Sequence, residues 1–146
     1  MSYILGQSGI VLIRSFETCR LVAYQDQRGI WTIGWGHTGP EVVEGLVWTQ
    51  SQADTVFSKD TMNAVLGVIR SIDVAINQNQ FDALVSFTYN VGIGSEGHST
   101  MVKLINQSQF AAAAAQFPLW NHCAGVVDAG LTRRRAAERA LFETPV

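Results

Sequence analysis

The sequence predicts a mostly helical α+β fold, in which a small β-containing lobe and a larger helical lobe are joined by a long helix. Two observations carry this prediction. Residues 21–48 are rich in β-branched and aromatic side chains and contain the turn-forming run Gln25–Gly29. From Thr49 onward the apolar residues recur with a helical period instead. Two lobes of this kind leave a cleft between them, which is a common place for a substrate.

The chain ahead of the β segment predicts a short helix. Ser8 is the expected N-cap of a helix that begins at Gly9, and the spacing of Ile13 and Phe16 places one apolar face inward. Glu17 falls at the end of that helix, against the negative end of the helix dipole. That position is a poor one for a purely stabilising charge, so Glu17 is a candidate functional residue.

The helical lobe is expected to contain several helices, each with its own cap. Thr49 and Gln52 match a capping box that opens a long helix, which ends at about Ser71. The run 77–80 starts another helix, and Gly92 is its expected C-cap. Further along the chain three more helices are expected, with the N-caps Ser99, Ser108 and Thr132.

Length and composition bound the class of protein. The chain has 146 residues, of which about half are apolar and 15% are charged, and this suits a single domain with a real core. We expect one domain over 1–146, with the smaller lobe at about 15–58 and the helical lobe at about 59–146 together with the N-terminal helix. A net charge of −2 without a broad basic face argues against a nucleic-acid binder.

No segment predicts passage into or across a membrane. The most apolar N-terminal run, residues 3–13, is interrupted by polar residues and is shorter than the roughly 20 residues of a spanning helix. Basic residues of the kind that open a secretory signal do not precede it. We therefore expect a protein that is made and kept in a cytoplasm, without stable membrane insertion. Cys19 and Cys123 indicate two free, partly buried thiols, and a disulfide between them stays open.

Residues 16–39 gather most of the notable polar side chains of a chain with few charges, namely Glu17, Asp26, Thr32 and His37. Cleavage of a glycosidic bond usually needs two carboxylic groups in unlike settings, one protonated and one ionised. Glu17 follows an apolar residue at a helix end, where a charge is disfavoured, whereas Asp26 lies in a polar turn, where it should stay ionised. The pair therefore suits glycoside hydrolysis.

The same residues resemble a known family. The spacing E-x8-D-x5-T from Glu17 to Thr32, followed by T-x-G-x-G-H at 32–37, is similar to the phage-type lysozymes, the muramidase endolysins of bacteriophages. The segments NQNQFDALVSFTYNVG (77–92) and LTRRRAAERALF (131–142) are similar as well, so the resemblance covers nearly the whole chain. It implies a lysozyme-like fold and hydrolysis of the β-1,4 bond between N-acetylmuramic acid and N-acetylglucosamine in peptidoglycan.

The resemblance also implies a role for each site residue. Glu17 would be the general acid, and Asp26 with Thr32 would place a water on the other side of the sugar, which is an inverting arrangement. His37 would be structural and would face Asp60 on the long helix. The residues expected to bind substrate or support the site are Arg135, placed near Glu17, together with Asn90 and Gly34.

The expected partner is the glycan strand of peptidoglycan, with no cofactor, no metal and no separate cell-wall-binding domain. Without an export signal, the enzyme would wait as a monomer in the host cytoplasm until a separate membrane-permeabilising phage protein lets it reach the wall in the periplasm.

Three other classes of protein are less suited to these residues. A wall-binding module would not need both carboxylates, and a lytic transglycosylase would not need Asp26. A metallopeptidase is disfavoured because the histidines at 37, 98 and 122 lack zinc-ligand spacing.

Overall fold

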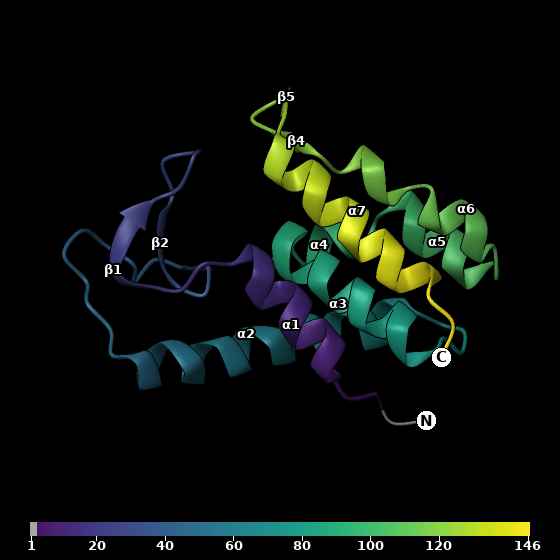
Figure 1. Ribbon diagram of the computed structural model, residues 1–146, viewed down its shortest axis with the longest axis horizontal. Helices are drawn as coiled ribbons and strands as arrows, with labels where there is room; N and C mark the ends of the chain where they lie inside the picture. The colour runs from purple at the N-terminus through teal and green to yellow at the C-terminus, as the bar shows by residue number, and fades with distance from the viewer. Residues whose placement is uncertain (1–2) are drawn as a thin grey trace.

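A small antiparallel sheet lies at one end of the computed structural model, and a group of helices fills the other end (Figure 1). The structure describes residues 3–146. The sheet has the strand order β1-β2-β3, with β1 at Arg20–Gln25, β2 at Trp31–Gly34 and β3 at His37–Thr38. Helix α2 (Gln50–Ser71) runs from the sheet toward the other helices (Figure 1). The predicted α+β arrangement with a long connecting helix is confirmed.

The β1–β2 hairpin forms where the sequence has turn chemistry. The Asp26 N–H donates to the Ile30 carbonyl at 2.9 Å, and the Gly29 N–H donates to the Asp26 carbonyl at 2.9 Å. Gly29 has a φ of 78°, a backbone conformation that glycine adopts without steric cost. Asp26 is therefore fixed at the tip of the hairpin, as predicted.

The two central helices begin at the capping residues that the sequence predicts. In α2, the Thr49 hydroxyl accepts from the Gln52 N–H at 3.1 Å, and the Gln52 side chain accepts from the Thr49 N–H at 2.8 Å. Asn77 and Gln80 make the same reciprocal pair at the start of α3 (Gln78–Val91). Each capping box involves residues within one helical turn, so the sequence pattern was sufficient to predict where both helices begin.

Helix α1 spans Gln7–Phe16, and its N-cap is Gly6 rather than Ser8. The Asp82 carboxylate, on α3, accepts hydrogen bonds from the N–H groups of Gly6 at 2.9 Å and Gly9 at 3.3 Å. Asp82 is only 1% exposed. A side chain from another helix thus caps α1, so the prediction of Ser8 was wrong.

The segments after α3 agree with the sequence in part. Gly92 ends α3 with a φ of 95°, as predicted, and Ser99 caps α5 by accepting from the Val102 N–H at 3.1 Å. Ser108 and Thr132 do not cap helices: the N-cap of α6 is Gln109, and Ser108 has a φ of 58°. These elements are α4 (Ile93–Gly97), α5 (Thr100–Asn106), α6 (Phe110–Ala114), the 3-10 helix η1 (Phe117–Leu119), β4 (His122–Cys123), β5 (Val126–Val127) and α7 (Ala129–Glu143).

The N-cap of α7 is Asp128, four residues ahead of the predicted cap Thr132. The Asp128 carboxylate accepts from the Leu131 N–H at 2.8 Å. The Thr132 hydroxyl donates to the Asp128 carbonyl at 2.9 Å, so it lies inside the first turns of the helix. The short β4–β5 hairpin, which the sequence did not predict, leads directly into this cap.

The core is built around α3, which packs against α1, α2 and α7. Phe81, Leu84 and Phe87 of α3 are all 0% exposed. At the edge of this core the Trp35 ring lies 5.9 Å from the Phe57 ring of α2, measured between centroids, and joins the sheet to the helices. Among the helices of residues 3–146, none combines the length and apolarity needed to cross a membrane. Both cysteines are free and partly buried, as predicted.

Candidate active site

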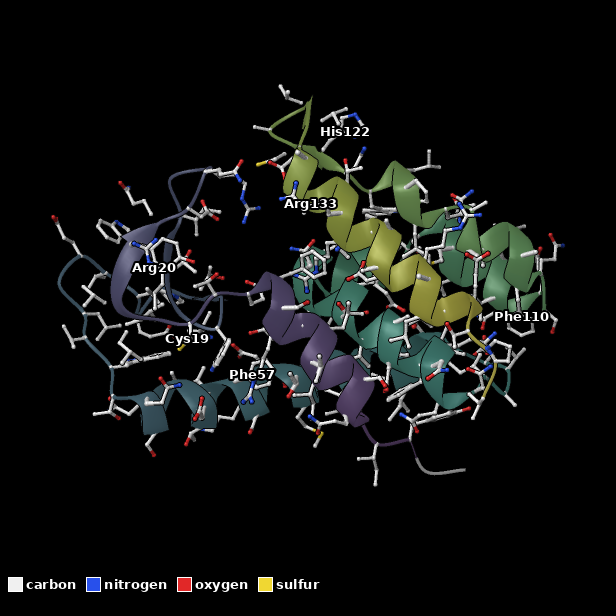
Figure 2. The ribbon with its side chains drawn as sticks, viewed as in Figure 1. Cys19, Arg20, Phe57, Phe110, His122 and Arg133 are labelled. Atoms are coloured by element: carbon white, nitrogen blue, oxygen red, sulfur yellow. The ribbon has the colours of Figure 1, made fainter. Side chains whose placement is uncertain are left out.

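A cleft of about 740 Å³ opens beside the tip of the β1–β2 hairpin, the end of α1 and the start of α7. Figure 2 shows His122 on the β4–β5 hairpin and Arg133 in the adjoining part of α7, at the side of the helical lobe nearer the sheet. Of the predicted site residues, this cleft brings together Glu17, Asp26, Asn90 and Arg135. Its other lining residues include Arg28, Leu119, Trp120, His122, Cys123, Asp128, Arg133 and Arg134.

Glu17 sits at the C-terminal end of α1, where its N–H donates to the Ile13 carbonyl at 2.9 Å. Its side chain is 19% exposed, and Arg134 Nη1 donates to its Oε1 at 2.7 Å. This contact places a positive charge directly beside the Glu17 carboxylate. From the sequence alone, Glu17 lies at an apolar helix end, a setting that disfavours a negative charge. The sequence did not reveal that a cation from α7 reaches this helix end.

Gly36 forms the other side of the Glu17 position. A Cβ atom on Gly36 would lie 2.3 Å from Glu17 Oε2, which no real structure tolerates without movement. The φ of Gly36 is 81°, a second reason why this position suits glycine. Gly36 lies within the T-x-G-x-G-H pattern of the sequence, but its contact with Glu17 appears only in the fold.

Arg135, the arginine expected beside Glu17, turns into the interior instead. It is 0% exposed, and its Nη2 donates to Asn90 Oδ1 at 2.8 Å. Its Nε lies 2.7 Å from Glu138 Oε1, an ion pair that is not aligned as a hydrogen bond. Neighbouring residues on a helix point about 100° apart, so the guanidinium groups of Arg134 and Arg135 turn to different partners, although both residues border the cleft. The predicted contact with Glu17 therefore belongs to Arg134.

Asp26 is held by its own turn. Its Oδ1 accepts from the N–H groups of Arg28 at 2.8 Å and Ile30 at 3.0 Å, and Arg28 Nη2 donates to its Oδ2 at 3.1 Å. Burial alone would raise the pKa of Asp26, but the hydrogen bonds from Ile30 and Arg28 and the Arg28 charge outweigh it and lower the pKa. Asp26 is accordingly ionised near neutral pH, which agrees with the reading of the turn.

Thr32 and Gly34 lie in β2, behind the surface of the cleft. Thr32 is 4% exposed, and its hydroxyl donates to the Ile30 carbonyl at 2.9 Å. Gly34 has a φ of 65°, and a Cβ atom there would lie 3.0 Å from the Trp48 ring. Neither residue is among those that line the cleft in the described chain. Both residues thus lie in the strand that adjoins the cleft.

His37 links the sheet to α2, as predicted, through Asp60. His37 Nδ1 lies 2.7 Å from Asp60 Oδ2, and the opposite ring nitrogen, Nε2, lies 2.6 Å from Glu41 Oε1. Burial alone would lower the pKa of His37, but the two carboxylates outweigh it and raise the pKa. Sequence reasoning missed Glu41, although it lies only four residues after His37.

Within residues 3–146, no three histidine, cysteine, aspartate or glutamate side chains gather in a way that could hold a metal ion. The chemical groups of the cleft include carboxylates, arginines, amides, an imidazole and a thiol, together with the apolar surface of Trp120 and Leu119. Two carboxylates of unlike setting in one cleft can supply a proton on one side of a bound molecule and accept one on the other.

Comparison with known proteins places this geometry in a family. The family model for phage lysozyme matches residues 14–138. The endolysin of Bacillus phage PZA is 44% identical over 142 residues, which cover 96% of this chain and 55% of that protein. This chain therefore spans about half the length of that relative.

Solved structures agree with the sequence comparison. The muramidase domain of SpmX from Asticaccaulis excentricus superposes with a TM-score of 0.87 at 38% identity, covering 99% of this chain and 100% of that one. A crystal structure of P22 lysozyme superposes with a TM-score of 0.80 at 35% identity, over 99% of this chain and 100% of that one. The predicted lysozyme-like fold is confirmed, and the chain belongs to the phage lysozyme family.

Proposed function

We propose that this protein is a muramidase endolysin, which hydrolyses the β-1,4 bond between N-acetylmuramic acid and N-acetylglucosamine in peptidoglycan. One observation carries the proposal: Glu17 and Asp26 line the same cleft from different elements, one paired with a buried arginine and the other held in a polar turn. Glycosidases use two carboxylic groups in this way. Membership of the phage lysozyme family supports the same reaction.

In the proposed mechanism Glu17 is the general acid. In this role Glu17 carries a proton when the sugar occupies the cleft. Glu17 then donates that proton to the leaving glycosidic oxygen. The Arg134 guanidinium, 2.7 Å from Glu17 Oε1, stabilises the carboxylate that forms as the proton leaves.

Asp26 is the general base in this mechanism. It accepts a proton from a water that attacks the sugar on the face away from Glu17, so that the configuration at the anomeric carbon inverts. Thr32 remains the proposed partner of that water. Because its hydroxyl hydrogen is donated to the Ile30 carbonyl, Thr32 would act toward the water as an acceptor.

Three further residues are proposed to support the site. Asn90 lines the cleft and accepts from Arg135, so the two side chains together form a rigid part of its wall. Gly34 lets β2 pass close to the Trp48 ring and so keeps the strand that carries Thr32 in place. Each of these roles is indirect, because it acts through the position of a neighbouring group.

The proposed biological setting is host lysis and phage release by a single catalytic domain over 1–146, with its smaller lobe at about 15–58. Its partner is the glycan strand, and it acts as a monomer without stable membrane insertion. We propose that the enzyme waits in the host cytoplasm until another phage protein permeabilises the membrane. Expression of this chain alone should leave cells intact until the membrane is opened chemically, and rapid lysis without that treatment would contradict the proposed route.

The reaction is tested by mass analysis of purified peptidoglycan after digestion. A muramidase releases fragments with new reducing ends at N-acetylmuramic acid, and the first product of inversion is the α-anomer, which is detectable by NMR. New free amines would indicate a peptidase, and anhydro ends would indicate a lytic transglycosylase. Binding to the wall without release of fragments would indicate a module that lacks catalysis.

A further inference from the structure

Glu138 is a carboxylate that lies completely inside the helical lobe. It is 0% exposed and contacts two arginines of its own helix, α7. Arg134 Nε lies 3.2 Å from Glu138 Oε2, and Arg135 Nε lies 2.7 Å from Oε1. The Ser86 hydroxyl, on α3, donates to Oε2 at 2.6 Å. A carboxylate with no access to water remains ionised only when such partners hold it.

Arg134 connects this buried carboxylate to the cleft. Its Nε donates to Glu138, its Nη2 donates to the Ser86 carbonyl at 3.1 Å, and its Nη1 donates to Glu17 at 2.7 Å. Every nitrogen of the guanidinium therefore has a fixed acceptor, and the Arg134 side chain is only 4% exposed. The orientation of Arg134 toward Glu17 depends on the two groups behind it.

The charges of this cluster balance only while Glu17 is ionised. Arg134 and Arg135 carry two positive charges, and Glu138 and Glu17 carry two negative ones. A proton on Glu17 leaves one positive charge in excess, and loss of the Glu138 charge as well would leave two. Because the cluster is buried, water screens these charges weakly, and each charge acts strongly on its neighbours.

We propose that Glu138 is a positioning residue for catalysis: it orients Arg134 against Glu17 and cancels one of the two arginine charges, and so sets the pH range in which Glu17 can hold its proton. The inference rests on the proposed role of Glu17 as the general acid. It assigns a function to a carboxylate that touches neither the cleft surface nor the substrate.

Other groups that face Glu17 cannot substitute for the influence of Glu138 on its charge. Burial and the Glu17 charge raise the pKa of Tyr24 on β1 and of Tyr89 on α3, so both phenols stay neutral in the working range. Gly36 faces Glu17 with backbone only. The charged side chains elsewhere in the cleft are more exposed to water than Glu138 and act more weakly, namely Asp26, Arg28, Asp128 and Arg133.

The experiment compares two isosteric variants that remove charges of opposite sign. Rates on purified peptidoglycan are measured across pH for Glu138→Gln and Arg135→Gln, and kcat/KM reports the free enzyme. In the proposed mechanism activity should fall at alkaline pH, because the general acid must carry a proton. We expect Glu138→Gln to move this alkaline limb to lower pH and Arg135→Gln to move it to higher pH, each by on the order of one pH unit.

The double variant Arg135→Gln/Glu138→Gln and a surface variant complete the test. The double variant removes one charge of each sign, so its alkaline limb should return close to that of the unmodified protein. Glu143→Gln is the matched control, because Glu143 pairs with Arg139 on the same helix at 3.1 Å, but both side chains are exposed. It should leave the limb where it is.

A lower rate at every pH with an unmoved alkaline limb would show that Glu138 only stabilises the fold, and would overturn the inference. Shifts of both single variants in the same direction would overturn it as well. If Glu138→Gln does not fold, the upward shift of Arg135→Gln remains the decisive result. Glu17→Gln is assayed alongside, and full activity of that variant would contradict the proposed function. If Glu17→Gln is inactive but the alkaline limbs of Glu138→Gln and Arg135→Gln do not move, only the role of Glu138 is contradicted.

Discussion

The two carboxylates of the cleft are held in opposite ways. Asp26 takes its partners from its own turn, since Arg28 and Ile30 lie two and four residues away. Glu17 takes its ion pair from Arg134, which is 117 residues away, and its close backbone neighbour from Gly36. The proposed base is therefore prepared by local structure, whereas the proposed acid exists in its working form only after α1 and α7 have packed together.

This difference predicts which substitutions should affect each carboxylate. A change that loosens the packing of α7 should alter the setting of Glu17 and leave that of Asp26 nearly intact. A change in the hairpin turn should do the reverse. The predictions below separate the two sides of the cleft, beginning with the two carboxylates themselves.

Removal of either carboxylate should nearly abolish activity while the fold survives. Glu17→Gln keeps the shape but removes the transferable proton, and Asp26→Asn removes the base, so each should lower kcat by about 10²–10⁴ or more. The check is release of reducing ends, with the melting temperature measured on the same samples. Near-normal turnover of Glu17→Gln would contradict the whole assignment.

The next largest effect is expected at Gly36, which borders only the Glu17 side. In Gly36→Ala the new methyl group would overlap Glu17 Oε2, and a carboxylate displaced by about 1 Å should cost about 10²-fold in rate. Gly45→Ala is the matched control, because Gly45 also has a positive φ, 88°, with nothing within 4 Å of an added Cβ.

Both glycine variants should lose about 1–2 kcal/mol of unfolding free energy to backbone strain, measured by denaturant titration. Only Gly36→Ala should lose activity beyond what that destabilisation explains. Equal activity losses in the two variants would show that the close approach to Glu17 is not what requires glycine at position 36.

The arginines of α7 should contribute unequally. Arg134→Gln removes the charge that contacts Glu17 and should lower kcat by about tenfold, because glutamine still offers one hydrogen bond. Arg133→Gln, at an exposed position with no contact to Glu17, should cost less. Equal and small losses, reduced further by salt, would mean that the run attracts anionic wall polymer in a general way.

The smallest effect on activity is expected at His37, which is a structural link. Because its two carboxylate partners raise the pKa of His37, the charged pair contributes its full stability below the unfolded-state pKa of about 6.5. That contribution is lost as pH rises through the higher folded-state value. His37→Asn should therefore cost about 2 kcal/mol of unfolding free energy at acidic pH and less at alkaline pH.

The control for His37 is His98→Asn, since the His98 ring is exposed and its Nδ1 lies 2.8 Å from a local carbonyl, that of Gly94. Activity of His37→Asn at a temperature where it stays folded should be close to normal. An inactive variant with an unchanged melting temperature would instead give His37 a direct part in the reaction.

Much of the fold and half of the site followed from short-range patterns. The capping boxes at Thr49 and Asn77, the hairpin turn around Asp26 and the end of α3 at Gly92 all involve groups within about four residues of each other. Backbone geometry brings such groups together whatever the rest of the chain does, so their sequence pattern is informative. The pairing of Glu17 with Asp26 in one cleft was also predicted, through the resemblance of the E-x8-D-x5-T pattern to the phage-type lysozymes.

The sequence by itself therefore determined most of the elements, apart from short ones such as the β4–β5 hairpin, together with the turn that holds Asp26 and the residue types that are available for the reaction. Only the tertiary structure decided that Asp82 rather than Ser8 caps α1, and that Arg134 rather than Arg135 meets Glu17. The physical reason is rotation: the direction in which each residue of α7 points depends on how the whole helix packs on α3. That rotation is the result of many apolar contacts in the core, and no local pattern of arginines records it.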